Sequence, residues 1–438
     1  MALNIINGTD AAERMDGTQQ RDLIHAAGGN DTAIGWFGND KIYGELGDDF
    51  VAGQAGNDTL FGGAGNDWLQ SDDYDQGYSD RMYGGAGNDK IFADDKIDYS
   101  YGGAGDDQVT IYFDVGGVAY GGAGVDTLVM NYIGASLNAA GVNYDVSVTL
   151  RGPDAGATSG PDSMVLAGFE ALTITTYMGN DTVTGGALND RIDVYSGANI
   201  VQAGAGDDYV SFHSGVQNML DGGAGQDTIH IIAWEDLDGL TLTVTGTDTV
   251  DDAGSVLTGF EIWQVNGSNF DDHVIFGDGS DWMRGRGGAD VVQGMRGHDR
   301  LAGGAGDDDL YGGIGGDVLR GGLGSDSLTG GAGADTFQFG QLKAVGDGIT
   351  DFVSGVDHIE IGARVIARVL SPGVVADSMF HMGDAIGDTG QFVYRAEAGA
   401  GLLIWDANGT GDGGELLIAR LDGAPPLVAA DLTILPFP

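Results

Sequence analysis

The sequence predicts an all-β fold, a right-handed parallel β-roll in which short strands stack into a solenoid. Two observations predict it. A nine-residue pattern, rich in glycine, with aspartate at its sixth position and an apolar residue at its eighth, runs in phase through most of the 438 residues. Glycine supplies 82 of them, and because each interior glycine costs a helix about 1 kcal/mol, helices are not expected. A short fixed period indicates units that pack only on their neighbours.

The repeat is clearest at residues 26–70, where five units follow one another without a break. Its phase extends back to Gly17, with Asp22 at the sixth position, and a weaker unit begins at Gly8. Eight more units fill residues 267–338. Isolated good units begin between these two runs, at residues 84, 102, 121, 185 and 222.

The local physics of one unit is a turn followed by a strand. Glycines at positions one, two and four allow positive φ, so we expect six residues to form a tight turn. Positions seven to nine then form a three-residue strand whose middle side chain points inward. Two units make one coil, and successive coils pair as parallel strands. The position-eight residues should therefore stack into an apolar column that contains Val51, Leu60, Leu69, Leu301, Leu310, Leu319 and Leu328.

The charge balance is strongly acidic. Asp and Glu total 66 against 18 Lys and Arg, a formal net charge of −48, while 42% of the residues are hydrophobic. Such a chain lacks the basic surface that nucleic acids and anionic membranes require, and it favours cations. Carboxylates stacked at the strand spacing of about 5 Å would repel one another strongly unless they were neutralised.

The nonapeptide resembles the repeats-in-toxin (RTX) family, whose pattern is G-G-x-G-x-D-x-U-x with U apolar. The resemblance implies a β-roll with calcium between turns stacked on the same side. In that family the ligands are position-six carboxylates and backbone carbonyls, here expected from positions one and three. The predicted carboxylate ligands are Asp31, Asp40, Asp49, Asp58, Asp67, Asp89, Asp107, Asp126, Asp181, Asp190, Asp208, Asp227, Asp272, Asp281, Asp290, Asp299, Asp308, Asp317, Asp326 and Asp335; Asp22 and the Asp98 of a poor unit share their position. The predicted carbonyl ligands are Gly44, Leu46, Gly53, Ala55, Gly62, Ala64, Gly303, Ala305, Gly312, Ile314, Gly321 and Leu323.

Calcium is the predicted metal, with many ions bound. Carboxylate and carbonyl oxygens suit a hard cation that tolerates six to eight ligands. Magnesium requires stricter geometry, and zinc prefers histidine or cysteine. A metal-free Asp-Gly turn would be the better interpretation of a single unit, but not of a stacked row of carboxylates.

The good units alternate with poor ones between residues 62 and 129 and again between 176 and 230. In the second stretch Asn199 and Gln217 are expected to replace the aspartate. Because two units make a coil, alternation in sequence means segregation in space. We therefore expect a calcium row on one edge of the central roll and a largely metal-free opposite edge, whereas 26–70 and 267–338 should carry calcium on both edges.

Two longer excursions, at about 130–175 and 231–266, interrupt the repeat. Alternating stretches such as 146–150 and 240–244 predict strands in both, either as a wider coil or as a β-hairpin. Nine of the 15 tyrosines fall between Tyr74 and Tyr144, either as a contact surface or, more simply, as rings stacked along the roll. The expected organisation is a roll at 1–129, a central roll with excursions at 130–266, a roll at 267–339 and a cap at 340–438.

The segments 348–361 and 402–423 resemble the cap that closes RTX rolls in serralysin-type proteases. The resemblance implies a C-terminal signal for type I secretion and contact with that apparatus. Within the cap, Asp406 and Asn408 could hold one more ion or form an ordinary turn.

The remaining features point to a secreted protein without catalytic machinery. The chain has no cysteine, no basic and apolar leader at its start, and no apolar stretch long enough to span a membrane. It contains no H-E-x-x-H or G-x-S-x-G motif. The sequence thus predicts a calcium-binding structural protein at the surface of a Gram-negative bacterium that self-associates or binds cell-surface polysaccharide. A soluble accessory or glycan-binding protein, or an enzyme with its site in the excursions or cap, remains the alternative.

Overall fold

The computed structural model describes the chain in segments. These are residues 3–71, 78–93, 98–112, 117–131, 147–149, 164–167, 169–214, 216–233, 238–245, 248–251, 254–340, 346–362, 372–385, 389–408 and 415–436. The chain divides into two compact units, one formed by 1–212 with 216–227 and the other by 213–215 with 228–438. Each unit is described separately below.

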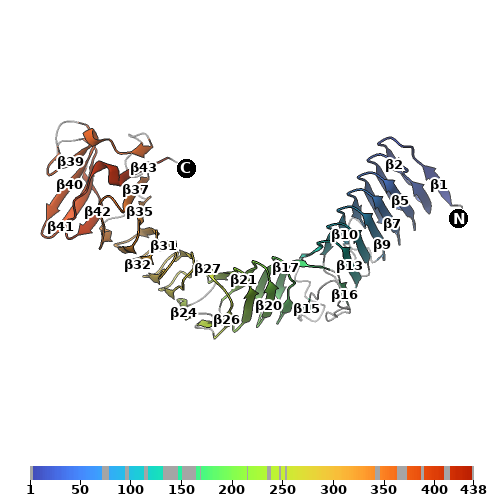
Figure 1. The fold of residues 1–438 in the computed structure, drawn as a ribbon, viewed down its shortest axis with the longest axis horizontal. Helices are drawn as coiled ribbons and strands as arrows, with labels where there is room; N and C mark the ends of the chain where they lie inside the picture. The colour runs from blue at the N-terminus through green and yellow to red at the C-terminus, as the bar shows by residue number, and fades with distance from the viewer. Residues whose placement is uncertain are drawn as a thin grey trace. The chain divides into compact units, whose positions relative to one another are not determined.

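The first unit stacks parallel strands on successive coils, which Figure 1 shows in blue to green. One sheet contains β1 (Asn4–Asn7), β3 (Asp22–His25), β5 (Lys41–Leu46), β7 (Thr59–Ala64), β9 (Arg81–Ala86), β11 (Tyr99–Ala104), β13 (Gly117–Ala123) and β16 (Met164–Ala167). The alternate strands form a second stack: β2 (Arg14–Asp16), β4 (Thr32–Phe37), β6 (Phe50–Ala55), β8 (Trp68–Gln70), β10 (Lys90–Ala93), β12 (Gln108–Tyr112), β14 (Thr127–Asn131), β17 (Ala171–Met178), β19 (Arg191–Ser196) and β21 (Tyr209–His213). A third stack contains β15 (Ser147–Thr149), β18 (Thr182–Thr184), β20 (Ile200–Ala205) and β22 (Met219–Ala224).

The second unit repeats this plan and ends in a C-terminal sheet. One stack contains β23 (Thr228–Ile232), β27 (Ile262–Asn266), β29 (Trp282–Arg284), β31 (Arg300–Ala305), β33 (Val318–Leu323), β35 (Thr336–Phe339), β37 (His358–Gly362) and β43 (Leu432–Leu435), with β38 (Gly373–Val374) antiparallel to β43. The other runs through β24 (Thr241–Thr245), β28 (His273–Ile275), β30 (Val291–Gln293), β32 (Asp309–Ile314), β34 (Ser327–Ala332), β36 (Gly348–Ile349), β42 (Glu415–Asp422), β41 (Ala400–Asp406), β40 (Gln391–Glu397) and β39 (Phe380–Met382).

The register confirms two nonapeptides per coil. Lys41 pairs with Thr59, and Leu310 pairs with Leu328, eighteen residues further along the chain. The position-eight side chains are buried as expected, but they form a column on each facing sheet, because alternate units lie on opposite sides of the coil. In the first unit, Val51 and Leu69 lie on one side of the coil and Leu60 on the other. In the second unit, Leu301 and Leu319 lie on one side and Leu310 and Leu328 on the other, and all seven side chains are 0–1% exposed.

Two local expectations were wrong. Many strands are six residues long and not three: β5 continues from position seven through position three of the next unit. Positive φ occurs at positions two and four, but the position-one glycines, Gly44 among them, do not adopt it. The missing side chain at position one instead leaves space beside the position-six carboxylate.

The two excursions differ within the described residues. In the first, strands form at Ser147–Thr149 and Met164–Ala167, and both pair in parallel with strands of the roll. Residues 132–146, 150–163 and 168 lie outside the described residues. The second forms an antiparallel sheet from β24, β25 (Asp248–Asp251) and β26 (Val256–Thr258). The predicted strands are therefore present, and the hairpin belongs to the second excursion.

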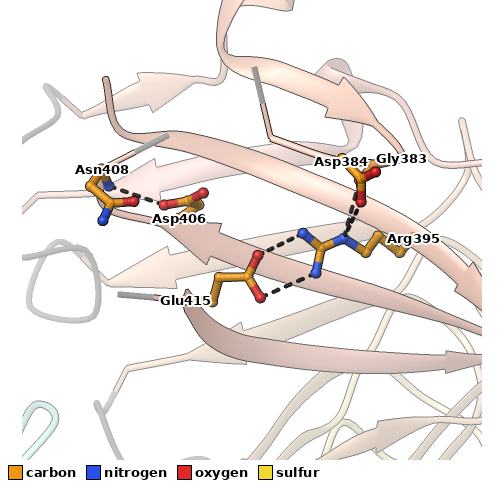
Figure 2. Close-up of polar contacts among 6 residues, drawn as sticks. All are labelled: Gly383, Asp384, Arg395, Asp406, Asn408 and Glu415. Atoms are coloured by element: carbon orange, nitrogen blue, oxygen red, sulfur yellow. Dashed lines mark hydrogen bonds and ion pairs between the residues drawn. The ribbon is translucent and has the colours of Figure 1, made fainter. Parts of the chain in front are cut away.

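The C-terminal sheet replaces parallel pairing by antiparallel pairing, since β40, β41 and β42 form a meander. Within this meander, Arg395 on β40 is linked to Glu415 on β42, as Figure 2 shows. Its guanidinium donates to both carboxylate oxygens of Glu415 at 2.6 and 3.1 Å and lies 3.5 Å from Asp384. The only helices in the described segments are the 3-10 turns η1 (Asp377–Met379) and η2 (Ala429–Asp431). None of the described helices is long and apolar enough to cross a bilayer.

Candidate calcium sites

The position-six aspartates form hydrogen-bonded rows along the roll. In each row one carboxylate oxygen, Oδ1, accepts the backbone N–H of the position-six residue one coil earlier. Asp31 donates to Asp49 at 2.7 Å in the first unit, and Asp290 donates to Asp308 at 2.9 Å in the second. All twenty predicted aspartates are buried, with 0–4% exposure. The rows thus bring carboxylates from successive coils together inside the roll.

The second oxygen, Oδ2, is left without a hydrogen-bond donor in most of these turns. Among the described residues this is the state of Asp31, Asp40, Asp49, Asp58, Asp67, Asp89, Asp107, Asp126, Asp208, Asp281, Asp290, Asp299, Asp308, Asp317, Asp326 and Asp335. A buried carboxylate oxygen without a donor is costly, because nothing replaces the water that it lost. A regular row of such atoms indicates that a cation belongs beside them.

The position-one glycine shows where that cation belongs. A Cβ on Gly44 would lie 2.5 Å from Asp49 Oδ2 and 2.5 Å from the carbonyl oxygen of Gly62, one coil later. The equivalent point at Gly312 lies 2.5 Å from Asp317 Oδ2 and 2.6 Å from the Gly330 carbonyl. A side chain at position one would therefore occupy the place where a carboxylate and a carbonyl oxygen converge.

The predicted carbonyls lie in this region in two ways. At position one, the carbonyl oxygens of Gly53, Gly62, Gly303 and Gly312 face the glycine of the preceding coil, and Gly44 and Gly321 occupy the same register. At position three, the carbonyls of Ala55, Ala64, Ala305, Ile314 and Leu323 accept the position-four N–H of the coil before at 2.7–3.0 Å, and Leu46 pairs with Gly28. A carbonyl oxygen has two lone pairs, so one remains for a cation.

The donor set fits calcium. Among the described residues no three His, Asp or Glu side chains gather as a cluster, so carboxylates alone would not enclose an ion. Each turn instead supplies one carboxylate and several carbonyl oxygens. An all-oxygen set with few charges and flexible geometry is the kind that Ca²⁺ accepts and that Mg²⁺ or Zn²⁺ does not.

Burial also favours the protonated form of the position-six aspartates when no cation is bound. Desolvation raises the pKa of Asp40, Asp58, Asp281 and Asp299 to about 7, against a smaller lowering by the backbone N–H that each accepts. Neighbouring carboxylates raise the pKa further. The roll therefore disfavours its own ionised carboxylates near neutral pH unless a cation compensates them.

In four turns of the described residues, a backbone donor takes the place that a cation would have. In these, the position-two backbone N–H donates to the Oδ2 atom: Thr18 to Asp22 at 2.6 Å, Gly186 to Asp190 at 2.5 Å, Ser268 to Asp272 at 2.9 Å, and Val353 to Asp357 at 2.7 Å. Elsewhere the position-two residue often has positive φ, even where it is not glycine, as at Trp36 (73°) and Gln54 (64°). Asp190 and Asp272 were both predicted ligands, and here both oxygens of each carboxylate already accept a backbone N–H.

The poor turns contribute more carboxylates to the position-six row than the sequence indicated. Asp80 and Asp98 accept the N–H of Asp58 and Asp80 at 2.7 and 2.8 Å, as the aspartates of good units do. Further on, Asn199 takes the position as expected, but the next residue in the row is Asn218 and not Gln217. The insertion of one residue in that turn moves the register.

The two asparagines substitute for a cation within their own turns. Asn199 Nδ2 donates to the Gly197 carbonyl at 3.2 Å, and Asn218 Nδ2 donates to the Val216 carbonyl at 2.8 Å. The amide thus supplies both the acceptor that the row requires and a donor for the turn carbonyl. This edge can close without metal at these two coils.

Several row members were missed by sequence reasoning. Glu170 of the first excursion accepts the Asp126 N–H at 2.8 Å, so a glutamate replaces the aspartate there. After the last good unit, Asp347 and Asp357 accept from Asp326 and Asp335 at 3.2 and 3.0 Å. The row therefore continues for one more coil after residue 339, where the repeat was expected to stop. The signal that could have revealed it was an aspartate directly before each short strand.

A second row at position five was also missed. Its Asn or Asp side chain accepts the position-five N–H one coil later, as when Asp48 donates to Asn30 at 3.1 Å and Asn66 donates to Asp48 at 2.8 Å. The recurring Asn-Asp pair at positions five and six was visible in the sequence. The two rows run in opposite directions and tie each coil to both neighbours.

The aromatic side chains of this unit stack along the roll. His25, Tyr43, Phe61, Tyr83, Tyr101 and Tyr120 form one continuous stack with ring centroids 4.7–5.1 Å apart. Their faces cover one another, so only the ring edges remain exposed to a partner. The simpler of the two expectations for the tyrosines therefore holds for Tyr83, Tyr101 and Tyr120.

Comparison with known proteins agrees with this geometry. Residues 7–42, 37–69, 74–109, 175–210, 277–310 and 311–341 match a family described as the RTX calcium-binding nonapeptide repeat (4 copies). No curated protein matches the chain. One similar solved structure is that of the AlgE6R3 subunit of the Azotobacter vinelandii mannuronan C5-epimerase, at 25% identity and a TM-score of 0.23, with 37% of this chain and 78% of that one covered. The chain therefore carries RTX calcium-binding nonapeptide repeats in several copies, within residues 7–109, 175–210 and 277–341.

Proposed function

We propose that the protein is a secreted, non-catalytic scaffold that folds when it binds calcium outside the cell and then assembles into a surface layer, biofilm matrix or adhesive layer. The observation that carries this proposal is the row of buried Oδ2 atoms beside position-one carbonyls. RTX repeats are typical of secreted bacterial proteins, which supports an extracellular site of action. The C-terminal sheet would cap the roll and, by its resemblance to serralysin-type caps, carry the signal for type I secretion.

The mechanism is a folding switch. Without calcium, the net charge of −48 and the buried carboxylates oppose the compact state. Calcium binds the folded coils and not the unfolded chain, so its binding free energy adds to the free energy of folding. At low cytosolic calcium the chain stays unfolded and can be exported, whereas outside it folds.

Circular dichroism during a calcium titration tests the switch. The chelated protein should lack β-structure and regain it as calcium is added, and magnesium at the same concentration should not replace calcium. β-Structure that persists unchanged in excess chelator would contradict the proposal.

Assembly is tested separately, on protein that has already folded in calcium. Electron microscopy and light scattering should show sheets or filaments that dissolve on chelation. A monomer at millimolar calcium would instead support the alternative, a soluble extracellular accessory protein. Turnover of polysaccharide or ester substrates by the folded protein would overturn the non-catalytic assignment.

A further inference from the structure

The second unit carries a basic groove on a chain that is otherwise acidic. The groove has a volume of about 810 Å3 and lies over β29, β31, β33 and β35. Arg284, Arg286, Arg300 and Arg320 line it, together with Trp282. Four of the 18 basic residues of the chain are therefore gathered on one face.

The ladder register explains how the arginines come together. Ala302 on β31 pairs with Arg284 on one side and Arg320 on the other, so these two side chains stand about 10 Å apart across three strands. Arg300 lies two residues before Ala302 on the same face and pairs with Trp282. The small Ala302 side chain thus forms the floor between three guanidinium groups.

These arginines are available to a ligand. Arg284, Arg300 and Arg320 are exposed, and no carboxylate of the described residues forms an ion pair with them. Among the described residues that line the groove, one is acidic: Glu360, which already accepts a hydrogen bond from Gln338 Nε2 at 2.7 Å. Arginine suits anions such as carboxylates and sulfates, since its planar guanidinium can donate two parallel hydrogen bonds to two oxygens of one group.

We propose that this groove binds an acidic polysaccharide, a glycan chain bearing carboxylate or sulfate groups. Guanidinium groups spread over about 10 Å match charges repeated along a polymer better than one small anion. Trp282, which is half-buried at the wall, offers an aromatic surface to a sugar ring. The groove is the face of a sheet, not its edge: β31 and β33 are hydrogen-bonded on both sides, so no backbone is open to an added peptide strand.

This inference needs the calcium-folded roll but not the assembly of a layer. The test therefore uses full-length protein whose fold in calcium has been verified by circular dichroism. Isothermal titration calorimetry would measure binding of short oligogalacturonates, sulfated oligosaccharides of similar length, and neutral gluco-oligosaccharides. We expect binding of one or both anionic glycans, weakening as salt rises, and none of the neutral one.

Matched variants locate the site. Arg284→Gln, Arg300→Gln and Arg320→Gln should each weaken binding about tenfold, the loss expected for one charged hydrogen bond of 1.5 kcal/mol or a little more. Ala302→Leu should also weaken it by filling the floor without changing the charge. Arg420→Gln, an exposed arginine of the same unit outside the groove, is the control and should bind as the wild type does.

Three results would overturn the proposal. The first is a folded wild type that binds neither anionic glycan. The second is equal binding by the wild type and the triple Gln variant, which would indicate calcium bridging to acidic turns. The third is binding of polyglutamate but of neither glycan, which would assign the groove to an acidic polypeptide. A calcium-folded protein that fails here leaves the folding switch intact, so the two proposals fail separately.

Discussion

At the scale of single residues, one glycine per unit makes room for the carboxylate. The position-one glycine does not adopt positive φ, yet a Cβ there would meet both a carboxylate and a carbonyl oxygen. Position one and position six are therefore coupled: the aspartate can turn its Oδ2 toward the carbonyls only because its partner five residues earlier has no side chain.

Gly44→Ala tests this coupling. The new methyl group would lie 2.5 Å from Asp49 Oδ2 and the Gly62 carbonyl, so we expect a loss of about 1–3 kcal/mol in the free energy of unfolding in calcium, as for overpacking in a core. Urea denaturation measures it. Gly28→Ala is the matched control, because its Cβ would find its nearest neighbour at 3.4 Å and should leave stability unchanged. Equal effects of the two changes would contradict the coupling.

Protonation provides a second test at the residue scale. Burial raises the pKa of Asp40, Asp58 and Asp299 to about 7, above the unfolded value of about 3.9. Without calcium the folded state binds more protons than the unfolded state, so its stability is full below about pH 4 and is lost as pH rises through 7.

We therefore expect the chelated protein to gain β-structure as the pH is lowered from about 8 to about 5. In calcium the trend is opposite: protons compete for the same oxygens, so the calcium midpoint should rise on acidification. Circular dichroism at fixed ionic strength measures both. A calcium midpoint independent of pH would show that the aspartates are not the ligands.

At the scale of the element, the buried polar atoms of a turn are satisfied in one of three ways. Most turns leave Oδ2 without a donor and carry positive φ at position two, as at Trp36 and Gln54. Others close with a position-two N–H, as at Asp190, or with an asparagine amide, as at Asn199. Only the first kind requires a cation, so the distribution of calcium follows from the type of turn.

Asn199→Asp together with Asn218→Asp should convert two closed turns into calcium-dependent ones. Each change removes a donor to a turn carbonyl and adds a buried charge. We expect lower stability in weakly saturating calcium and recovery at high calcium, with a steeper dependence of the melting temperature on calcium concentration. Gln217→Glu, next to the row but not in it, serves as the control and should leave that dependence unchanged.

The element scale also shows how far the sequence could be interpreted. The coil length, the buried columns to which Leu60 and Leu310 belong, and the carboxylate rows all follow from periodicity, which is local information. The register of irregular turns does not: Asn218 replaced Gln217 because one inserted residue shifts the turn, and Glu170 joined the row from 44 residues away. Those positions depend on which strands pair, and spacing alone does not determine it. The basic groove was likewise invisible, since Arg284 and Arg320 meet only through Ala302.

At the scale of the whole molecule, the carboxylates that produce the net charge of −48 form two populations, one exposed and one buried. Exposed carboxylates are screened by salt within about 10 Å, whereas the buried Oδ2 atoms are reached only by an ion that loses its water. Net charge alone therefore does not determine the stability of the roll.

This division predicts that salt cannot replace calcium. About 1 M sodium chloride screens surface repulsion almost completely. The chelated protein should nevertheless stay unfolded in it, because the buried oxygens remain without a partner. Intrinsic tryptophan fluorescence and circular dichroism in sodium chloride with chelator measure this. Recovery of the native spectrum in salt alone would mean that surface repulsion, and not coordination, keeps the chain open.

The direction of the position-six row makes the two ends of that row unequal. Each backbone N–H in the row finds its acceptor on the following coil, and the last acceptors, Asp347 and Asp357, belong to segments that pair with the C-terminal strands β42 and β43. The position-five row runs the other way, so its last N–H groups, such as that of Ser325, already have acceptors on the coil before. The segments after the last repeat therefore complete the position-six row alone, and a chain cut before residue 346 would leave the N–H groups of Asp326 and Asp335 without these acceptors.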